Sequence, residues 1–443
     1  MGESSVDKTK KNVTERGSPV GSTPDSLQHG IRLAIDASNI RIGGGVTHLV
    51  EILRAAEPVA HGFEKICVWA RASTLEQIED RDWLEKRSLT DREANLLGRV
   101  IWQRWTLPRV LEEWRADLLW VPGGSIIPTF RPVVTMSRNM LPFDWKELRR
   151  FGFSWVALKL LILRWSQSYS FHRADGTIFL TRYAYDAVTE VAGPLTGRTA
   201  IIPHGVNARF QLQPRRQRTR SEFTPSDPIR VVYVSTIDEF KHQWFVVEAI
   251  GRLQREGMPI RLDLYGSART STLPRLTSAM KRVDPEGKFV RYWGAVDYKE
   301  IHKCYADADL CVFASSCENM PNILIESMAA GLPIACSNRG PMPEVLRDAG
   351  LYFNPEKSAS IAQAVRYLIM APRLRAEKAS AASTIAASFS WSRCARETFE
   401  FLATVASDSS LRSRAPRLSK GVVPTTVKGR EALLAADKRT TES

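Results

Sequence analysis

The sequence predicts an α/β protein of two domains, each built on a parallel sheet covered by helices. Three observations lead to this fold class. The chain has 443 residues, which is long for one domain and ample for two. Short apolar runs of strand length alternate with stretches of helical periodicity. The alternation ends near residue 206 and begins again near residue 229, so the pattern occurs twice.

The composition is that of a globular protein with an excess of positive charge. Hydrophobic residues make up 44% of the chain, and the formal net charge is +14. Such a field attracts polyanions such as nucleic acid, anionic lipid or phosphate-bearing substrates. Much of the excess lies in two local segments, 215–220 and the chain after Leu411. Basic segments of this kind are usually solvated, and no nucleic-acid motif accompanies them, so we expect no nucleic-acid partner.

The six cysteines are scattered, and no two stand in a Cys-x-x-Cys pair. This distribution predicts free thiols in a reducing compartment and argues against a disulfide framework or a zinc site. The N-terminus is too polar for a signal peptide, and no apolar run is long enough to span a bilayer. We therefore expect a cytoplasmic protein.

The N-terminal domain is predicted over residues 29–206, after a disordered polar tail at 1–28. Its first strand, 31–36, is followed by glycines 43–45 and a helix over 46–56. A strand, a glycine loop and a helix let a phosphate or a sugar approach the backbone. A flexible turn explains the same residues equally well.

The remainder of this half continues the alternation. Further strands are expected at 67–70, 117–121, 132–136 and 176–180. Helical stretches are expected over 75–116, with Trp102, Trp105 and Trp114 as packing residues.

Residues 145–173 combine apolar and basic side chains at helical spacing. One face carries Phe151, Trp155, Leu158, Ile162 and Trp165, while Glu147 is the only acid in the span. A basic helix with tryptophans suits an anionic membrane surface. An ordinary helix packed on the N-terminal sheet is the alternative.

The C-terminal domain is predicted over residues 207–389. Its first strand, 229–234, leads into a loop, and Lys241 is expected to begin a helix that runs to Glu256. Further strands are expected at 261–266, 290–294, 310–314 and 334–336. A closing helix at 390–406 is assigned to the N-terminal domain, and a basic disordered tail is expected at 411–443.

The stretch 315–351 carries the strongest functional signal. A buried strand before it, a loop and a helix over 323–330 form part of a βαβ unit, whose loops lie where parallel sheets bind ligands. Glu318 lies in the loop and Glu326 on the helix. The N–H groups of Asn319 to Asn322 at the helix N-terminus suit a phosphate. A pair of glutamates alone is more often a surface feature.

The same stretch resembles the signature of the retaining glycosyltransferases of family four, which have the GT-B fold. Their pattern is a Glu, seven residues, a second Glu, then Ala/Met-Ala-x-Gly-x-Pro and later Gly-x-x-x-Glu. The matching residues here are Glu318, Glu326, Met328 to Pro333, Gly340 and Glu344. The resemblance covers about residues 30–406 and implies two Rossmann-like domains that face an inter-domain cleft.

The resemblance implies a binding site for a nucleoside-diphosphate sugar in that cleft. Glu318 would hold the donor sugar, Glu326 the ribose, and Lys241 would stabilise the leaving diphosphate. Other implied donor contacts are Asn319, Met320, Pro321, Asn322, Ser235, Thr236, Gly266, Gly294 and Val296. Residues implied at the cleft or acceptor side are Gly44, Gly45, Arg138 and Asn139.

The sequence departs from the family pattern at two places. Thr236 stands where an arginine, five residues before the lysine, helps to grip the diphosphate. Arg138 and Asn139 stand where a His-Asp pair lies near the reacting sugar. The diphosphate would then depend on Lys241, polar side chains and backbone amides, with help from His242.

The resemblance implies a retaining, hexosyltransferase-type enzyme that moves a sugar to a hydroxyl of a saccharide or lipid-linked saccharide, as in polysaccharide or lipopolysaccharide biosynthesis. No cofactor and no metal ion are expected. Asp307 and Asp309 spell a metal motif, but they precede a strand and lie away from the expected site. Three alternatives stay open: a nucleotide-sugar 2-epimerase, an inactive nucleotide-sugar-binding protein and a nucleic-acid binder.

Overall fold

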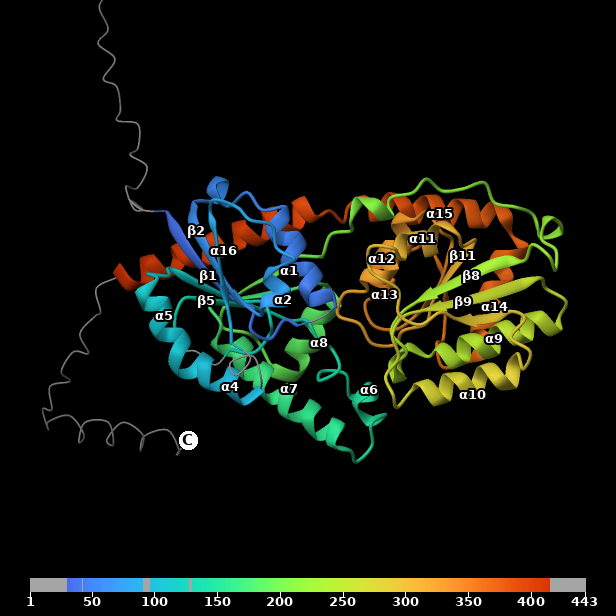
Figure 1. Ribbon diagram of the computed structural model, residues 1–443, viewed down its shortest axis with the longest axis horizontal. Coiled ribbons are helices and arrows are strands. Elements are labelled where there is room, and N and C mark those ends of the chain that lie inside the picture. Colours follow the sequence, from blue (N-terminus) through green and yellow to red (C-terminus); the bar gives the residue numbers. More distant parts are fainter. Residues whose placement is uncertain (1–29, 42, 91–95, 127–129, 415–443) are drawn as a thin grey trace, which may run out of the picture.

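A computed structural model describes residues 30–41, 43–90, 96–126 and 130–414. Within these ranges the chain forms two α/β domains that lie side by side (Figure 1). The N-terminal domain has a seven-stranded sheet and the C-terminal domain a six-stranded sheet, and the strand pairings are parallel. The predicted α/β fold class is therefore confirmed. The predicted tail at 1–28 lies outside the described residues.

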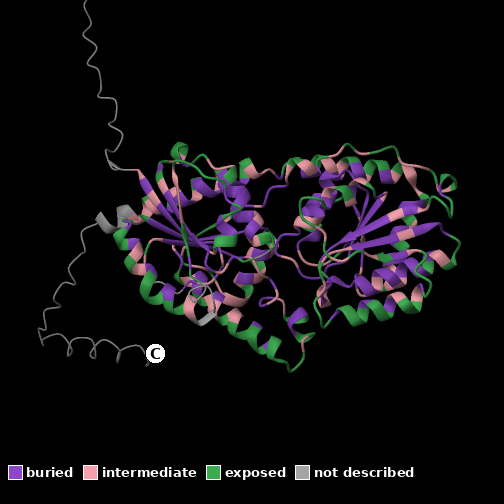
Figure 2. Ribbon diagram, viewed as in Figure 1, coloured by how far each residue is buried: buried purple, intermediate pink, exposed green. Residues whose placement is uncertain are grey.

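The order of the N-terminal sheet is β3-β2-β1-β4-β5-β6-β7. Its strands are β1 (Ile31–Asp36), β2 (Phe63–Ala70), β3 (Leu84–Ser88), β4 (Leu118–Val121), β5 (Val133–Met136), β6 (Gly176–Phe179) and β7 (Arg198–Ile201). The central strands are buried because helices cover both faces, as Figure 2 shows. The order reverses between β1 and β4, which opens a crevice at their carboxyl ends.

The helices of this half are α1 (Gly44–Arg54), α2 (Ala72–Leu75), α4 (Leu96–Ile101), α5 (Leu107–Glu113), α6 (Trp145–Arg149), α7 (Trp155–Arg173) and α8 (Arg182–Ala192). Two expectations for 75–116 are wrong. The edge strand β3 interrupts the predicted helical stretch, because its pairing with β2 outweighs the helical preference of its charged residues. Trp105 is 61% exposed, whereas Trp102 and Trp114 are buried.

The C-terminal sheet has the order β10-β9-β8-β11-β12-β13. Its strands are β8 (Ile229–Val234), β9 (Ile260–Tyr265), β10 (Val290–Tyr292), β11 (Leu310–Phe313), β12 (Ile334–Ser337) and β13 (Leu351–Phe353). Its helices are α9 (Gln243–Arg255), α10 (Leu273–Val283), α11 (Ile301–Ala306), α12 (Asn322–Ala329), α13 (Met342–Leu346), α14 (Ser358–Met370) and α15 (Pro372–Ala386). The order reverses between β8 and β11, which places the loops after these strands at the ligand-binding edge.

The chain crosses between the domains twice, near Gly205 and again before α16 (Trp391–Arg414). A Cβ at Gly205 would lie 2.2 Å from the backbone nitrogen of Trp391, so glycine is needed here for close approach of the two crossing segments. The helix α16 then packs against α1 (Figure 1). It continues through Arg414, so the predicted tail from 411 begins too early. Residues 415–443 lie outside the described residues.

No helix within the described residues is both long and apolar enough to cross a bilayer. The predicted basic helix at 145–173 is in fact two helices, α6 and α7, separated by a turn that contains Gly152 in a left-handed conformation. The outer face of α7 is exposed along much of its length (Figure 2).

Candidate functional site

A cleft of about 660 Å³ opens between the two domains, at the carboxyl ends of the strands beside each crevice. Both domains contribute residues to its walls. The sequence-predicted residues that line it are Gly44, Ser235, Thr236, Gly266, Val296, Glu318, Met320, Pro321, Asn322 and Glu326. Residues that line it without having been predicted include Arg41, Gln77, Tyr298 and Phe313.

Lys241 lies on a short 3-10 turn after β8 and is not itself among the residues that line the cleft. The prediction that it begins a helix is wrong, because His242 adopts a left-handed backbone conformation and α9 starts only at Gln243. The hydroxyl of Tyr233 donates to the carbonyl of Lys241 at 2.7 Å and holds the turn in place. The Nζ of Lys241 forms an ion pair with Oε1 of Glu318, which comes from the loop after β11. Two strand-end loops are thus joined by one pair of opposite charges.

His242 does not add positive charge to this pair. Its Nε2 lies 2.8 Å from the hydroxyl oxygen of Ser316, and burial lowers the pKa of the imidazole to about 3. The ring is therefore neutral near pH 7. The expectation that His242 helps Lys241 to carry charge is wrong, because the left-handed turn directs the ring into the protein interior.

Glu326 lies on α12 with its carboxylate among tyrosines. The hydroxyl of Tyr298 donates to Oε1 at 3.2 Å, and that of Tyr305 donates to Oε2 at 3.3 Å. Burial raises the pKa of Glu326 to about 7, against the lowering effect of these hydrogen bonds. The guanidinium of Arg209 stacks on Tyr298 at 4.3 Å. Glu326 is therefore a rigidly held acceptor whose charge changes near neutral pH.

The loop between the two glutamates forms part of the cleft wall and also contacts the N-terminal domain. Pro321 and Asn322 line the cleft where α12 begins, so the first N–H groups of the helix lie at its wall. Asn319 instead faces the other domain: its side-chain amide donates to the hydroxyl of Ser137 at 3.1 Å, and its carbonyl accepts from Thr181 at 3.0 Å. Asn319 is a contact between the domains and is not among the residues that line the cleft.

The opposite wall of the C-terminal part is formed by the ends of β8, β9 and β10. Gly266 adopts φ +137°, and a Cβ there would lie 2.1 Å from the carbonyl oxygen of Ser235. Its N–H donates to the carbonyl of Gly294 at 2.7 Å. Thr236 is exposed at this edge. Gly266, Ser235, Thr236 and Val296 line the cleft, whereas Gly294 lies behind it.

Arg138 and Asn139 follow β5 on the N-terminal side. Oδ1 of Asn139 accepts from the backbone N–H of Leu141 at 3.1 Å and stabilises the local turn. The guanidinium of Arg138 lies against Gly45, where an added Cβ would be 3.2 Å from Nη1 and Nη2. Burial lowers the pKa of Arg138 to about 10. Neither residue is among those that line the cleft, but Gly45 follows Gly44, which does.

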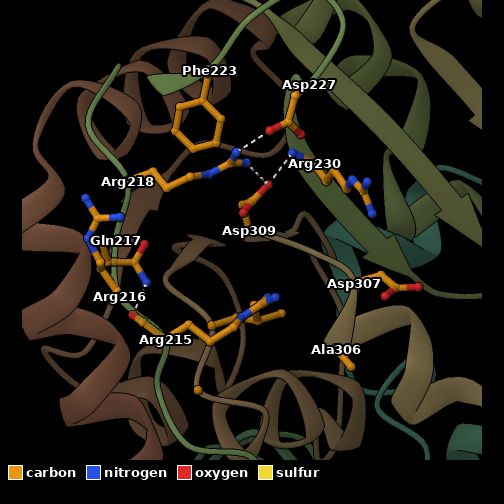
Figure 3. Close-up of a pocket in the computed structure, with 12 residues that line it drawn as sticks. Arg215, Arg216, Gln217, Arg218, Phe223, Asp227, Arg230, Ala306, Asp307 and Asp309 are labelled. Atoms are coloured by element: carbon orange, nitrogen blue, oxygen red, sulfur yellow. Dashed lines mark hydrogen bonds and ion pairs between the residues drawn. The ribbon is translucent and has the colours of Figure 1, made fainter. Parts of the chain in front are cut away.

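A second pocket, of about 360 Å³, lies on the C-terminal domain and contains Asp307 and Asp309 (Figure 3). The carboxylate of Asp309 accepts from the backbone N–H of Arg230 at 2.9 Å and pairs with Arg218 at 3.5 Å. Arg218 also pairs with Asp227 at 2.5 Å. Asp309 is therefore engaged in an ion-pair network. Both aspartates lie outside the inter-domain cleft, as the sequence analysis predicted.

The domains are also joined beside the cleft. The carboxylate of Glu344, on α13, accepts hydrogen bonds from the backbone N–H groups of Arg182 at 2.7 Å and Tyr183 at 2.8 Å. These are the first N–H groups of α8 in the other domain, so Glu344 supplements the cap of that helix. A second crossing pairs Glu356 with Lys146 and Arg150 at 2.7 and 2.6 Å.

Two family models match the chain. Glycosyl transferases group 1 matches residues 228–371, and Glycosyltransferase Family 4 matches residues 42–210. The chain belongs to this glycosyltransferase family. The two matches fall on the C-terminal and N-terminal domains respectively, and the family-four resemblance drawn from the sequence is confirmed.

The curated relatives of this protein align with it over only part of their length. Glycogen synthase of Mycobacterium tuberculosis is 26% identical over 256 residues, which are 57% of this chain and 59% of the synthase. O-antigen chain mannosyltransferase B of Escherichia coli is 28% identical over 170 residues, 38% of this chain and 44% of that protein. The chain thus spans about half the length of these relatives.

Solved structures of glycosyltransferases share the fold. Anabaena HepE in complex with UDP has a TM-score of 0.62 at 19% identity, covering 84% of this chain and 100% of that one. WaaG, a glycosyltransferase involved in lipopolysaccharide biosynthesis, has a TM-score of 0.62 at 14% identity, covering 84% and 99%. The GT-B fold expected from the sequence is therefore confirmed.

Proposed function

We propose that this protein transfers a sugar from a nucleoside-diphosphate sugar to an acceptor hydroxyl, with retention of configuration at the anomeric carbon. The observation that carries the proposal is that Glu318 and Glu326 line the inter-domain cleft and that Lys241 forms an ion pair with Glu318. Family membership supports it, and HepE has been solved with UDP and with UDP-glucose.

Each part of the cleft wall suits one part of such a donor. The Glu326 carboxylate can accept hydrogen bonds from two ribose hydroxyls. The N-terminus of α12 can donate N–H groups to phosphate oxygens. Glu318, at the end of β11, can accept from hydroxyls of the donor sugar.

In the proposed reaction the bond between the anomeric carbon and the diphosphate oxygen breaks, and the acceptor oxygen bonds to the same face of that carbon. The acceptor proton passes to an oxygen of the leaving diphosphate, so no protein nucleophile is needed. Lys241 stabilises the charge that develops on the leaving group. A bound diphosphate competes with Glu318 for the ammonium of Lys241, which frees Glu318 for the sugar. We further propose that the transfer needs no metal ion and persists in excess chelator.

We also propose that the acceptor is lipid-linked. The partner of α7 in this proposal is the surface of an anionic lipid bilayer. Trp155 and Trp165 on α7 are 75% and 73% exposed, and Phe153 just before it is fully exposed. Lys159 and Arg173 are exposed on the same helix, while Glu147, the only acid in 145–173, is buried against Arg150. An apolar and basic surface complements anionic lipid headgroups.

The first test is thermal stabilisation by UDP, GDP, ADP and dTDP, for the wild type and for Glu326→Ala. Ligand binding raises the free energy of unfolding by about 2.7 kcal/mol at a hundredfold excess over Kd. We expect one nucleotide to stabilise the wild type, the Glu326 variant to lose this effect, and the exposed control Glu76→Ala to keep it. No stabilisation of the wild type by any nucleotide would contradict the proposal.

The matching nucleotide sugars are then incubated with and without saccharide acceptors, and the products are separated. Transfer to an acceptor with retained anomeric configuration supports the proposed reaction. Conversion of the nucleotide sugar without any acceptor indicates the 2-epimerase instead. Binding without turnover in any condition indicates a nucleotide-sugar-binding protein.

A further inference from the structure

We propose that Arg138 binds the donor diphosphate from the N-terminal domain and replaces the arginine that the family pattern places at Thr236. The inference rests on the proposed function, and it assigns to the N-terminal side of the cleft a charge that the C-terminal wall lacks. Arg138 would act as a binding residue for the diphosphate oxygens, through the two parallel N–H groups of its guanidinium.

The first argument is the charge of Arg138 itself. Arg138 is partly buried, its guanidinium packs against the first turn of α1, and no carboxylate pairs with it among the residues that the structure describes. Burial alone lowers its pKa, to about 10, so the group still carries its charge near neutral pH. A buried cation without a counter-ion is unfavourable in free energy. A bound anion would supply the missing counter-ion.

The second argument is that the neighbours of Arg138 cannot supply this counter-ion. His48 and His204 stack beside it with ring centroids 4.5 Å apart. Burial and the charge of Arg138 lower the pKa of both imidazoles, that of His204 to about 3, so both rings are neutral. Nδ1 of His204 lies 3.0 Å from Oδ1 of Asn322, so this amide oxygen already has a hydrogen-bond partner other than Arg138.

The third argument is the place where Arg138 lies. Gly45 belongs to the first turn of α1, and an added Cβ at the preceding Gly44 would lie 3.6 Å from the side-chain amide nitrogen of Asn322, the first residue of α12. The N-termini of two helices thus face each other, one from each domain. Both present N–H groups and positive potential. Arg138 does not itself line the cleft, but its guanidinium lies against Gly45, the residue after the cleft-lining Gly44, and so adds a full charge beside this point.

The fourth argument is the shortage of charge on the C-terminal wall. Lys241 is already paired with Glu318, and Thr236 is neutral. A diphosphate carries more negative charge than the one lysine can balance. Arg41 also lines the cleft, from the exposed loop after β1, and is the competing candidate for the second cation.

The test compares the Kd of the preferred nucleoside diphosphate with that of its monophosphate and nucleoside, by calorimetry on the full chain. These probes contain no sugar other than ribose, so a change in their binding reports on phosphate recognition and not on the donor sugar or the acceptor. The variants are Arg138→Met, Arg138→Lys, Arg41→Met and the exposed surface control Arg109→Met. Methionine keeps the approximate length of the side chain and removes the charge. Thermal melting checks that each variant folds.

We expect Arg138→Met to weaken diphosphate binding about 10- to 100-fold, with nucleoside binding unchanged. Arg138→Lys should retain part of the affinity because it keeps the charge without the planar fork. The change Thr236→Arg, added to Arg138→Met, should restore the preference for diphosphate. The inference would be overturned if Arg138→Met left the ratio of the diphosphate Kd to the nucleoside Kd unchanged. It would also be overturned if only Arg41→Met lowered the affinity for diphosphate. Absence of nucleotide binding by the wild type would contradict the proposed function itself.

Discussion

Lys241 and Glu318 form an ion pair that joins the turn after β8 to the loop after β11. Both side chains are largely buried, with exposed fractions of 10% and 15%. Glu318 is therefore already paired with the ammonium group that would stabilise the leaving diphosphate. Two opposite effects of mutation follow from this one contact, because removing either partner leaves the other free.

Replacing Glu318 by glutamine should separate binding from catalysis. The change frees the ammonium of Lys241, so diphosphate should bind several-fold more tightly. Sugar transfer should fall by about 100-fold or more, because the charged acceptor for the hydroxyls of the donor sugar is replaced by a weaker, neutral amide oxygen. Calorimetry and a transfer assay measure the two quantities. Weaker binding of diphosphate by Glu318→Gln would show that Lys241 does not bind it.

Replacing Lys241 by methionine should weaken both properties. We expect transfer to fall by about 100- to 1000-fold, the loss typical of removing one group that stabilises a developing anion. The conservative change Lys241→Arg should recover part of the rate. The exposed Lys299→Met serves as the matched control for a lost lysine charge. A Lys241→Met enzyme with the wild-type rate would refute the assigned role.

The carboxyl of Glu326 predicts a pH dependence because its pKa is raised to about 7 from the usual 4.5. Between these values the folded chain holds a proton that the unfolded chain has released, so the stability contributed by this group falls as the pH rises through that window. Ribose hydroxyls donate better to the ionised form. Nucleotide affinity should therefore rise from about pH 6 to about pH 8, and Glu326→Gln should abolish this rise.

Much of the fold could be predicted because buried parallel strands are short apolar runs that stand out in the sequence. The two glutamates could be predicted for a related reason: Glu318 ends the loop after such a run, and Glu326 lies eight positions later on the following helix. The strand β3 could not be predicted in this way, because Leu84–Ser88 is an edge strand rich in charged residues and has no apolar alternation.

The partners of Glu326 could not be predicted because they come from a separate part of the chain. Tyr298 and Tyr305 precede it by 28 and 21 residues, and the C-terminal sheet brings them together. The left-handed His242 was also missed, since a positive φ is uncommon for any residue other than glycine, although histidine is among the residues enriched there. The isolated charge of Arg138 became visible only once its neighbours were known. The sequence did carry one signal for the role of Arg138: a charged residue stands at a strand end where the family pattern has a histidine.

Removing the carboxylate of Glu344 should loosen the contact between the domains. Glu344→Ala leaves the N–H groups of Arg182 and Tyr183 without this partner, at a cost of about 0.5–2 kcal/mol for a helix-capping interaction. We expect a larger radius of gyration in small-angle scattering and roughly tenfold slower transfer. Nucleotide affinity should hardly change, because most of the proposed donor contacts belong to the C-terminal wall. Glu377→Ala on the exposed surface of α15 is the control.

The exposed face of α7 predicts binding to anionic vesicles. The double change Trp155→Ser and Trp165→Ser should weaken sedimentation with vesicles of phosphatidylglycerol and phosphatidylcholine by about tenfold, since it removes two interfacial aromatic anchors. Lys159→Gln should weaken binding less, and the loss should be greatest at low salt because charge attraction is screened. Transfer to a soluble acceptor should remain unchanged in all of these variants, as α7 lies outside the cleft.

A matched control separates membrane binding from a general effect of exposed aromatic residues. Tyr367 on α14 is 60% exposed in the C-terminal domain and lies far along the chain from α7, so Tyr367→Ser should leave vesicle binding intact. Binding of the wild type to pure phosphatidylcholine should be weak, because the basic residues then lack an anionic partner. Equal binding of the wild type and the tryptophan variant to anionic vesicles would rule out α7 as the membrane surface.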